Sequence, residues 1–379
     1  TTLGWLLCCL KKINVKNMNN MALIDKEFKL ILKKRGMQSI DMGSEISDSW
    51  ARCISNGLDP FKGPKKSVIS SQELDQIREE KEDLRKIVIP ELELLYSQVA
   101  GTNFMVAFSD NEGLVLDTIY DETCLQTDVG KSVIPGSIWA EKVCGTNGLG
   151  LAVEIQKSTI VSGKEHFFTD HEKLSCFASP ITNYDGKIIG IIDASTDARS
   201  REQHTLALVN LATRSIETKL FINKFSNELI LSFHPRQEYL STTSVGLLAI
   251  NGDGLIVGSN TNAKIMLHGL VDLKNQNFNN IFTSSFSSIA SDLLNNKVLK
   301  IADYLGSSVF VIKNQNLKPN QTHELIVKNK TYACNNCKDK KIKREKCILI
   351  RSTFAETNNI SVASRKLGVS RTTIYKHLS

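Results

Sequence analysis

The sequence predicts an α+β protein whose C-terminal segment is entirely helical. Runs with alternating apolar residues flank two Asp-Gly turns, at 183–186 and 251–254, which is typical of antiparallel hairpins. Amphipathic runs with helical spacing lie before and after these hairpins. Residues 347–379 instead show short helical patterns joined by a turn at Gly368. We therefore expect antiparallel sheets covered by helices, followed by a small helical unit.

Composition fits a globular protein of two to four domains. The 379 residues are 41% hydrophobic and 23% charged, and the formal net charge is +7. The nine cysteines form no evenly spaced framework, and no secretory signal is evident. The apolar run Leu3–Leu10 is much shorter than the ~20 residues of a membrane-spanning helix. We expect a cytoplasmic protein without a membrane partner.

Changes in pattern along the chain divide it into six predicted segments. These are a disordered or upstream extension (1–21), an N-terminal helical segment (22–70), a first α+β domain with flanking helices (71–225), a second α+β domain (226–330), a basic cysteine-containing linker (331–346) and the helical unit (347–379). In the linker, lysine and arginine are concentrated between Lys338 and Lys346, which would strengthen attraction to phosphates.

Three long helical patterns are predicted in the first 225 residues. Phe28–Gly57 reads as a helix stopped by Gly57 and Pro60, and Ser67–Ser97 as an amphipathic helix bent or split at Pro90. Arg201–Phe225 carries a heptad-like apolar spacing, which suits either a dimer seam or packing on a sheet.

Strands are predicted where the apolar pattern has period two. The predicted pairs are Phe104–Phe108 with Leu114–Thr118, Phe177–Thr182 with Lys187–Ala194, and Val245–Ile250 with Leu255–Ser259. Single strands are expected at Thr159–Ser162, Ser308–Lys313 and His323–Lys328, and a short helix at Asn262–His268.

The last helices have the pattern of a helix-turn-helix. Ser361 is a plausible N-cap of a short helix, Gly368 follows it, and Ser370 caps a second helix with polar and basic residues outside. The alternative is a helical hairpin that packs on the body of the protein. The side chains predicted to contact DNA are Ser361, Ser370, Arg371, Thr372, Thr373, Tyr375 and Lys376.

ASRKLGVSRTTIYKHL resembles the Fis-type DNA-binding segment that closes bacterial enhancer-binding activators. The resemblance implies that the helix beginning near Ser370 enters the major groove of double-stranded DNA. Arg371 and Lys376 would then contact phosphates or guanine edges.

Three further blocks, SWARCISNGLDP, Pro135–Ala152 and Gly163–Ser195, are similar to the GAF-type sensor of the acetoin-catabolism regulator (AcoR-like) family. The second α+β domain resembles a PAS domain. The ATPase module normal in that family is missing from the pattern: Gly130-Lys131-Ser132 has Leu125 where a P-loop requires glycine. This departure from the family pattern predicts a regulator that neither hydrolyses ATP nor remodels polymerase by itself.

Aromatic and small residues of the first domain are candidates for an effector pocket, although each could equally be core. Gly145 permits close backbone approach, and Asn147 offers both a donor and an acceptor. The predicted ligand-binding residues are Phe104, Trp139, Gly145, Thr146, Asn147, His166 and Phe167.

Metal and thiol chemistry are weaker readings of the cysteines and histidines. Glu165-His166, Asp170-His171 and Cys176 could hold a metal, or Cys176 could act as a nucleophile with a histidine as base. Cys334, Cys337 and Cys347, with His323, could bind zinc or form a redox switch, but exposed linker cysteines are the favoured interpretation. We predict no cofactor.

Together these patterns and resemblances imply a homodimeric, non-enzymatic transcription regulator that senses a small-molecule effector. Two classes compete with it. One is a sensing adaptor that docks on an ATPase-bearing activator, and the other is a thiol redox or metal sensor.

Overall fold

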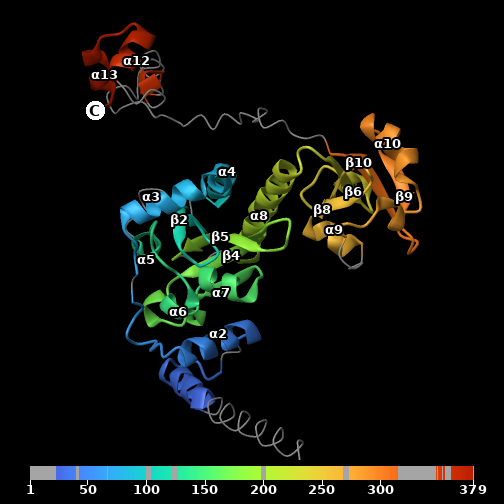
Figure 1. Cartoon of the computed structure of the whole chain (residues 1–379). Coiled ribbons are helices and arrows are strands. Elements are labelled where there is room, and N and C mark those ends of the chain that lie inside the picture. The colour runs from blue at the N-terminus through green and yellow to red at the C-terminus, as the bar shows by residue number, and fades with distance from the viewer. Residues whose placement is uncertain are drawn as a thin grey trace, which may run out of the picture. The chain divides into compact units, whose positions relative to one another are not determined.

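The computed structural model consists of two compact units, Thr1–Asn314 and Gln315–Ser379. The first contains two five-stranded antiparallel sheets and their covering helices, and the second is helical (Figure 1). The residues that the structure describes are 23–39, 42–65, 67–99, 104–120, 124, 127–197, 202–267, 273–314, 347, 349–351, 353–354 and 360–378. Within these ranges, no helix is long and apolar enough to cross a membrane.

The N-terminal region forms two helices rather than the single one predicted. Residues 23–34 are helical, and α2 spans Ser44–Ser55. The first helix ends at Gly36, which has φ +64°. The Gly36 amide bonds the Lys33 carbonyl and the Met37 amide bonds that of Leu32, the paired pattern of a Schellman motif. The spacing of apolar residues in the sequence continues across this break because both helices bury apolar residues in one cluster with Trp50.

The next helical pattern is split, but at Lys81 and not at Pro90. α3 (Ser71–Glu80) is capped by the Ser70 side chain, and α4 (Glu82–Val99) runs through Pro90. Proline removes one helical hydrogen bond. Burial of Glu91, Leu92 and Leu95 next to Pro90 shows that tertiary packing holds this turn in place.

The first sheet has the strand order β2-β1-β5-β4-β3. Its strands are β1 (Met105–Ser109), β2 (Val115–Ile119), β3 (Thr159–Ser162), β4 (Ser175–Thr182) and β5 (Ile188–Thr196). The predicted β1–β2 and β4–β5 hairpins are confirmed. One face of the sheet packs on α4 and on α8 (Glu202–Lys224). Val209, Thr213 and Ile216 are buried in α8, so its heptad-like positions pack inside this domain.

The opposite face of this sheet is covered by the segments that connect β2 to β4. They comprise α5 (Asp128–Ser132), α6 (Glu141–Cys144), α7 (Gly148–Ile155) and two short 3₁₀ turns, Gly163–Glu165 and Thr169–His171. Alternate strand residues such as Met105, Ala107 and Cys176 form a separate core with Trp139 and Leu149 on this side. The two faces of the sheet therefore have different surroundings.

The second sheet has the order β8-β7-β6-β10-β9. Its strands are β6 (Leu229–His234), β7 (Gly246–Ile250), β8 (Ile256–Ser259), β9 (Leu299–Ala302) and β10 (Ser308–Lys313). The predicted β7–β8 hairpin and the strand β10 are confirmed, whereas the central strand β6 and the edge strand β9 were not predicted. The strand predicted at 323–328 lies outside the described residues.

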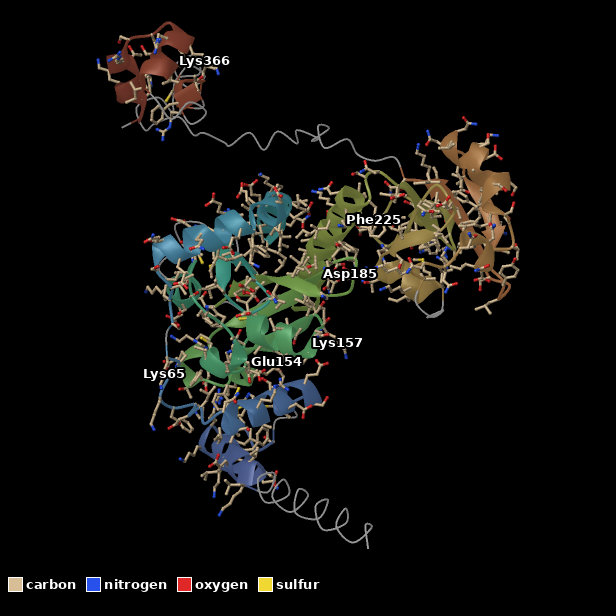
Figure 2. The ribbon with its side chains drawn as sticks, viewed as in Figure 1. Lys65, Glu154, Lys157, Asp185, Phe225 and Lys366 are labelled. Atoms are coloured by element: carbon tan, nitrogen blue, oxygen red, sulfur yellow. The ribbon has the colours of Figure 1, made fainter. Side chains whose placement is uncertain are left out.

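The last turn of α8 packs on one face of the second sheet. Phe221 and Phe225 share a core with Ile230, Leu247 and Ala249 (Figure 2). The other face is covered by α9 (Thr261–Met266), by α10 (Phe286–Leu294) and by the 3₁₀ turn Phe278–Asn280. Helix α8 thus contributes to the cores of both sheets.

In the second unit, α12 (Ile360–Leu367) and α13 (Arg371–Leu378) are joined through Gly368, which has φ +62°. Ser370 caps α13, since its Oγ accepts the Thr373 amide at 3.1 Å. Helix α12 begins at Ile360, so Ser361 lies inside the helix and is not its N-cap as predicted. Ile350, Ala363 and Ile374 form the buried core of this unit.

Candidate functional site

The sequence blocks that resemble a sensor meet in space beside the first sheet. Helix α2 docks on the start of α6 through the Glu141 carboxylate, of which only 3% is exposed. Ser49 Oγ donates to this carboxylate at 2.7 Å, and Arg52 donates to it through Nε at 2.7 Å and Nη2 at 2.9 Å. A buried carboxylate is stable only when it is paired in this way. Glu141 therefore holds α2 against the domain.

Further polar contacts extend this docking to the loop before α7. The hydroxyls of Ser49 and Thr146 lie 2.7 Å apart. Trp50 is fully buried, and its Nε1 donates to the Glu165 carbonyl at 2.8 Å. The helical block thus contacts both of the other two blocks.

Arg35 makes a second buried connection from the N-terminal region. Its guanidinium pairs with Glu172 at 2.7 Å, donates to the carbonyls of His166 and Phe167 at 3.0 Å, and lies 4.9 Å from the Trp50 ring centre. Desolvation by burial lowers the pKa of Arg35, although Glu172 opposes the shift. These partners accept hydrogen bonds from Nε and from both terminal nitrogens of the guanidinium.

The loop at residues 145–147 is shaped by close packing. Gly145 has φ +64°, and a Cβ there would lie 2.8 Å from that of Phe167. Asn147 Oδ1 accepts the Gly150 amide at 2.9 Å and so caps α7, while Nδ2 donates to the carbonyls of Trp139 and Gly145. The donor and acceptor that suggested a ligand contact at Asn147 therefore already have partners within the loop.

Behind this loop, four buried side chains form a hydrogen-bonded row. His166 Nδ1 lies 3.1 Å from the Gly163 carbonyl, and its Nε2 lies 3.4 Å from Cys176 Sγ. Ser195 Oγ lies 3.1 Å from the same sulfur and also bonds Asp193. A carbonyl can only accept, so Nδ1 carries the imidazole proton and Nε2 accepts from the thiol. Ser195 has one hydrogen, so when it donates to sulfur it accepts from a protonated Asp193.

Burial disfavours the charged form at both ends of this row. Desolvation lowers the pKa of His166 to about 3, with repulsion from His171 and Arg35 adding to it. Desolvation raises the pKa of Asp193 to about 7 and also raises that of Cys176. The thiol is therefore a poor nucleophile at neutral pH, which weighs against the catalytic reading.

Most of the predicted ligand-binding residues lie on one side of the sheet, fully or nearly buried. Trp139 packs on His171 with ring centres 5.1 Å apart, and His166 and Phe167 lie nearby. Phe104 is not brought to them, because it lies on the α4–α8 face beside Phe177. Sequence reasoning missed the partners Arg52, Glu141, Asp193 and Ser195, although all four lie in the quoted blocks. Their charged and hydroxyl side chains among apolar neighbours were the available signal.

The metal readings find little support among the described residues. No group of three or more histidine, cysteine or acidic side chains in those ranges is arranged to hold a metal ion. Cys144 is buried, donates to the Ile138 carbonyl, and has its pKa raised to about 12 by desolvation, as expected for a packed thiol. Cys347 is buried in the second unit, while Cys334, Cys337 and His323 lie outside the described residues.

The predicted DNA-contacting residues lie along α13 and its cap. Ser370, Arg371 and Lys376 are exposed, and Thr373 is half-buried. The side chains of Ser361, Thr372 and Tyr375 lie outside what the structure describes. Residues 360–378 contain four lysines and arginines and no acidic residue, and the side chains of Arg365, Lys366, Arg371 and Lys376 are all exposed.

Removing the cation that faces Glu141 should loosen α2. The substitution Arg52→Met keeps the aliphatic stem but leaves a buried carboxylate with only Ser49 as a charge-stabilising side chain. We expect a loss of about 2–3 kcal/mol in unfolding free energy, measured by urea titration with tryptophan fluorescence. Lys157→Met is the matched control, because Lys157 pairs with Glu45 of the same helix at 3.9 Å but is 73% exposed (Figure 2). The control should lose less than about 0.5 kcal/mol. Equal losses in the two variants would contradict the conclusion that the buried Arg52–Glu141 pair holds α2 against the domain.

Asp193 should make stability depend on pH. Its folded pKa is raised to about 7, so the folded protein retains a proton that the unfolded chain releases near pH 4. The stability carried by the protonated form is complete below about pH 4 and is lost as pH rises through 7. Asp193→Asn stays neutral, so its stability relative to wild type should improve by about 1–3 kcal/mol between pH 5 and pH 8. Asp185→Asn, on an exposed turn, should show no such trend, and a flat difference for Asp193→Asn would refute the assignment.

Comparison with known proteins shows that part of this chain is similar to transcriptional regulators. Residues 32–218 match the family model described as MimR, N-terminal domain. A signal-transduction and transcriptional-control protein of Clostridium beijerinckii is 30% identical over 240 residues, which is 63% of this chain and 38% of that protein. The acetoin catabolism regulatory protein of Cupriavidus necator is 29% identical over 229 residues, 59% of this chain and 34% of that protein. The chain thus spans little more than a third of the length of these relatives.

Among solved structures, the E. coli DhaR(N)–DhaL complex contains a chain that aligns with 71% of this one and is itself 98% covered, at 14% identity and a TM-score of 0.41. The relatives include activators named AcoR and MimR, in agreement with the resemblance of the sensor blocks. The homologues of this chain are transcriptional regulators of the AcoR and MimR type, and the chain shares with them the N-terminal domain matched at residues 32–218.

Proposed function

We propose that this chain is a sequence-specific DNA-binding transcription regulator that senses a small metabolite through its first α+β domain. The observation that carries the proposal is the exposed basic surface of α12 and α13 in a chain whose first domain is homologous to transcriptional regulators. A helical pair that served only to pack on the protein would have no need of four exposed cations in a stretch, 360–378, that contains no acidic residue.

In this proposal α13 enters the major groove. Arg371 is the first residue of the helix and is exposed, so it can reach guanine edges or phosphates from the helix N-terminus. Lys376 lies more than a turn further on and adds a phosphate contact. One short helix supplies few base contacts, so a homodimer reading two half-sites is proposed.

The proposed regulator acts without hydrolysing ATP. A phosphate-cradling ATPase fold needs a parallel strand–loop–helix arrangement. The described residues between α8 and Asn314 form instead the antiparallel sheet β8-β7-β6-β10-β9. This sheet and the sequence around Gly130 both support the proposal that polymerase is not remodelled by this chain itself.

Effector sensing is assigned to the side of the first sheet that holds Trp139 and residues 145–147. The polar groups of Thr146 and Asn147 are engaged by Ser49 and by the loop itself. A metabolite binding there would compete for these contacts and so alter the docking of α2. The exit helix α8, which packs on both sheets, would carry the change onward.

The DNA-binding half of the proposal is tested by Arg371→Ala. The titration uses the full chain and DNA from upstream of its own gene, by fluorescence anisotropy at two salt concentrations. Loss of a groove-contacting arginine should weaken binding at least tenfold, about 1.4 kcal/mol. Lys264→Ala on α9 removes one exposed positive charge elsewhere and should change the affinity little.

Equal affinities for the two variants would contradict groove reading by α13. Wild-type binding that is weak and disappears with salt would mean attraction to phosphate alone. That result would favour the adaptor that docks on an ATPase-bearing activator.

A further inference from the structure

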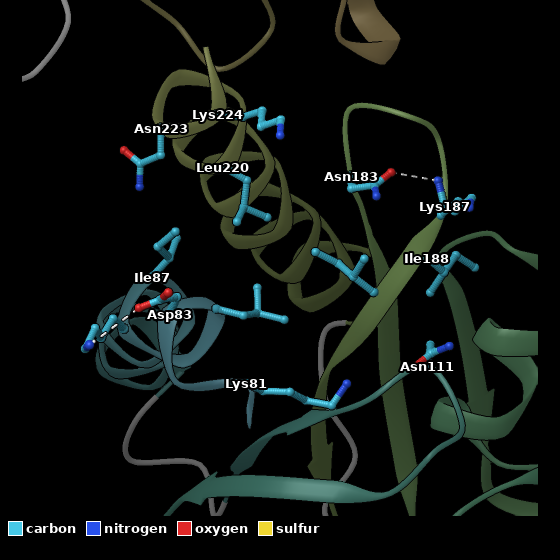
Figure 3. Close-up of a pocket in the computed structure, with 13 residues that line it drawn as sticks. Lys81, Asp83, Ile87, Asn111, Asn183, Lys187, Ile188, Leu220, Asn223 and Lys224 are labelled. Atoms are coloured by element: carbon cyan, nitrogen blue, oxygen red, sulfur yellow. Dashed lines mark hydrogen bonds and ion pairs between the residues drawn. The ribbon is translucent and has the colours of Figure 1, made fainter. Parts of the chain in front are cut away.

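A groove of about 840 Å³ lies on the opposite side of the first sheet from Trp139, where α4, α8 and two strand-connecting turns meet (Figure 3). Its walls are the start of α4, the last two turns of α8, the β4–β5 turn and Asn111 of the β1–β2 turn. The volume falls in the range of small-molecule sites, roughly 300–1,000 Å³. Neither the sequence patterns nor the family resemblance indicated it.

The lining is aliphatic and contains no aromatic ring. Five half-buried side chains from three elements contribute the apolar surface: Leu84, Ile87, Ile188, Ile189 and Leu220. Leu84, Ile87, Ile189 and Leu220 pack against the core between the sheet and α4 and α8, whereas Ile188 packs on the Trp139 side. The groove is therefore mainly an extension of the α4–α8 core that remains open to solvent. Such a surface favours a flexible hydrocarbon body in a ligand.

Uncompensated positive charge surrounds this apolar surface. Four lysines line the groove, and one of them, Lys86, is paired with Asp83 at 3.5 Å and with Glu82 at 3.8 Å. Within the described part of the chain, Lys81, Lys187 and Lys224 form no ion pair, and the Lys224 ammonium lies over the Tyr184 ring at 5.3 Å. A ligand that complements three such cations carries a negative charge.

From this juxtaposition we propose that the groove binds an anionic amphiphile, with an aliphatic body on the isoleucines and leucines and a carboxylate or phosphate between Lys81 and Lys187. The exposed amides of Asn111 and Asn223 are available to a hydroxyl or keto group on the body. The inference rests on the proposed sensing function and adds a ligand class and a second place on the domain.

The position of the groove links occupancy to the second sheet. Leu220, Asn223 and Lys224 lie in the last turns of α8. Phe221 of the same turns and Phe225, which follows the helix, are part of the second sheet's core. A ligand that bridges α4 and α8 would therefore fix the helix end on which that core depends. A ligand in the groove would change the orientation of α8 only if it bound one orientation of the helix more tightly than another.

The test is isothermal titration of the full chain with octanoate, octyl phosphate and the neutral control 1-octanol. Saturable binding of octanoate, with at least tenfold weaker binding of 1-octanol, is expected. The double substitution Lys81→Met and Lys187→Met should weaken octanoate binding at least tenfold, whereas Lys157→Met, outside the groove, should leave it unchanged. Both groove lysines are solvent-accessible, so circular dichroism of the variants should match wild type.

The two anionic probes distinguish the sources of the charge. Octanoate binding alone assigns the groove to carboxylates, and octyl phosphate binding alone assigns it to phosphate esters. Absence of binding by both, equal binding of 1-octanol, or binding that survives the double substitution would overturn the proposal. A parallel DNA titration separates failure of the groove proposal from failure of the proposed DNA-binding function. If only the groove proposal is wrong, operator binding remains. If only the DNA-binding function is wrong, octanoate binding remains.

Discussion

The structure of the first unit depends on one helix that belongs to two cores. Val209 and Ile216 of α8 are buried under the first sheet, and Phe221 and Phe225 are buried against the second. The contact at the second sheet is closely packed, since a Cβ on Gly258 would lie within 2.4 Å of the Phe225 ring. Close-packed contacts of this kind transmit displacement instead of absorbing it. A displacement of α8 in the first domain would therefore displace the residues that pack on it in the second domain.

Charge, and not only apolar packing, makes the N-terminal helices part of the first domain. Arg35 and Glu141 are both buried, and each is satisfied by partners that are distant in sequence. Such pairs add less net stability than an apolar contact of equal size, but leaving one partner alone is costly. The arrangement therefore specifies one docking position of α2, because a shifted helix would strand a buried charge. The same region contains the buried row from His166 to Asp193, so polar side chains lie among apolar ones there and are screened from water.

Local signals in the sequence predicted the local structure well. Asp-Gly turns gave the hairpins at 183–186 and 251–254, and Ser370 gave the start of α13, because these residues act within a few positions of themselves. The break at Gly36 was overlooked because periodicity continues across it, and the split at Lys81 was misplaced because proline is the stronger local signal. Strand β6 (Leu229–His234) was missed because no strand was predicted between the helical pattern that ends at Phe225 and the hairpin that begins at Val245.

The site was less accessible to sequence reasoning, for a different physical reason. Period two separates the faces of a strand but does not say which helix covers which face. Phe104 was therefore grouped with Trp139, although the sheet lies between them. The pairs Arg52–Glu141 and Arg35–Glu172 join residues separated by 89 and 137 positions. No local pattern encodes contacts across such distances.

The place of β6 has a consequence for how this chain can be divided. The strand begins at Leu229, five residues after α8 ends at Lys224, and pairs with both β7 and β10 at the middle of its sheet. A cut after the strand would remove the centre of the sheet, and a cut before it would uncover Ile230, Leu247 and Ala249 by taking Phe221 and Phe225 away. The two α+β domains thus have no boundary at which the chain could be cut without disrupting the second domain. Recombination that exchanged the first α+β domain for another one would have to keep α8 together with the second sheet.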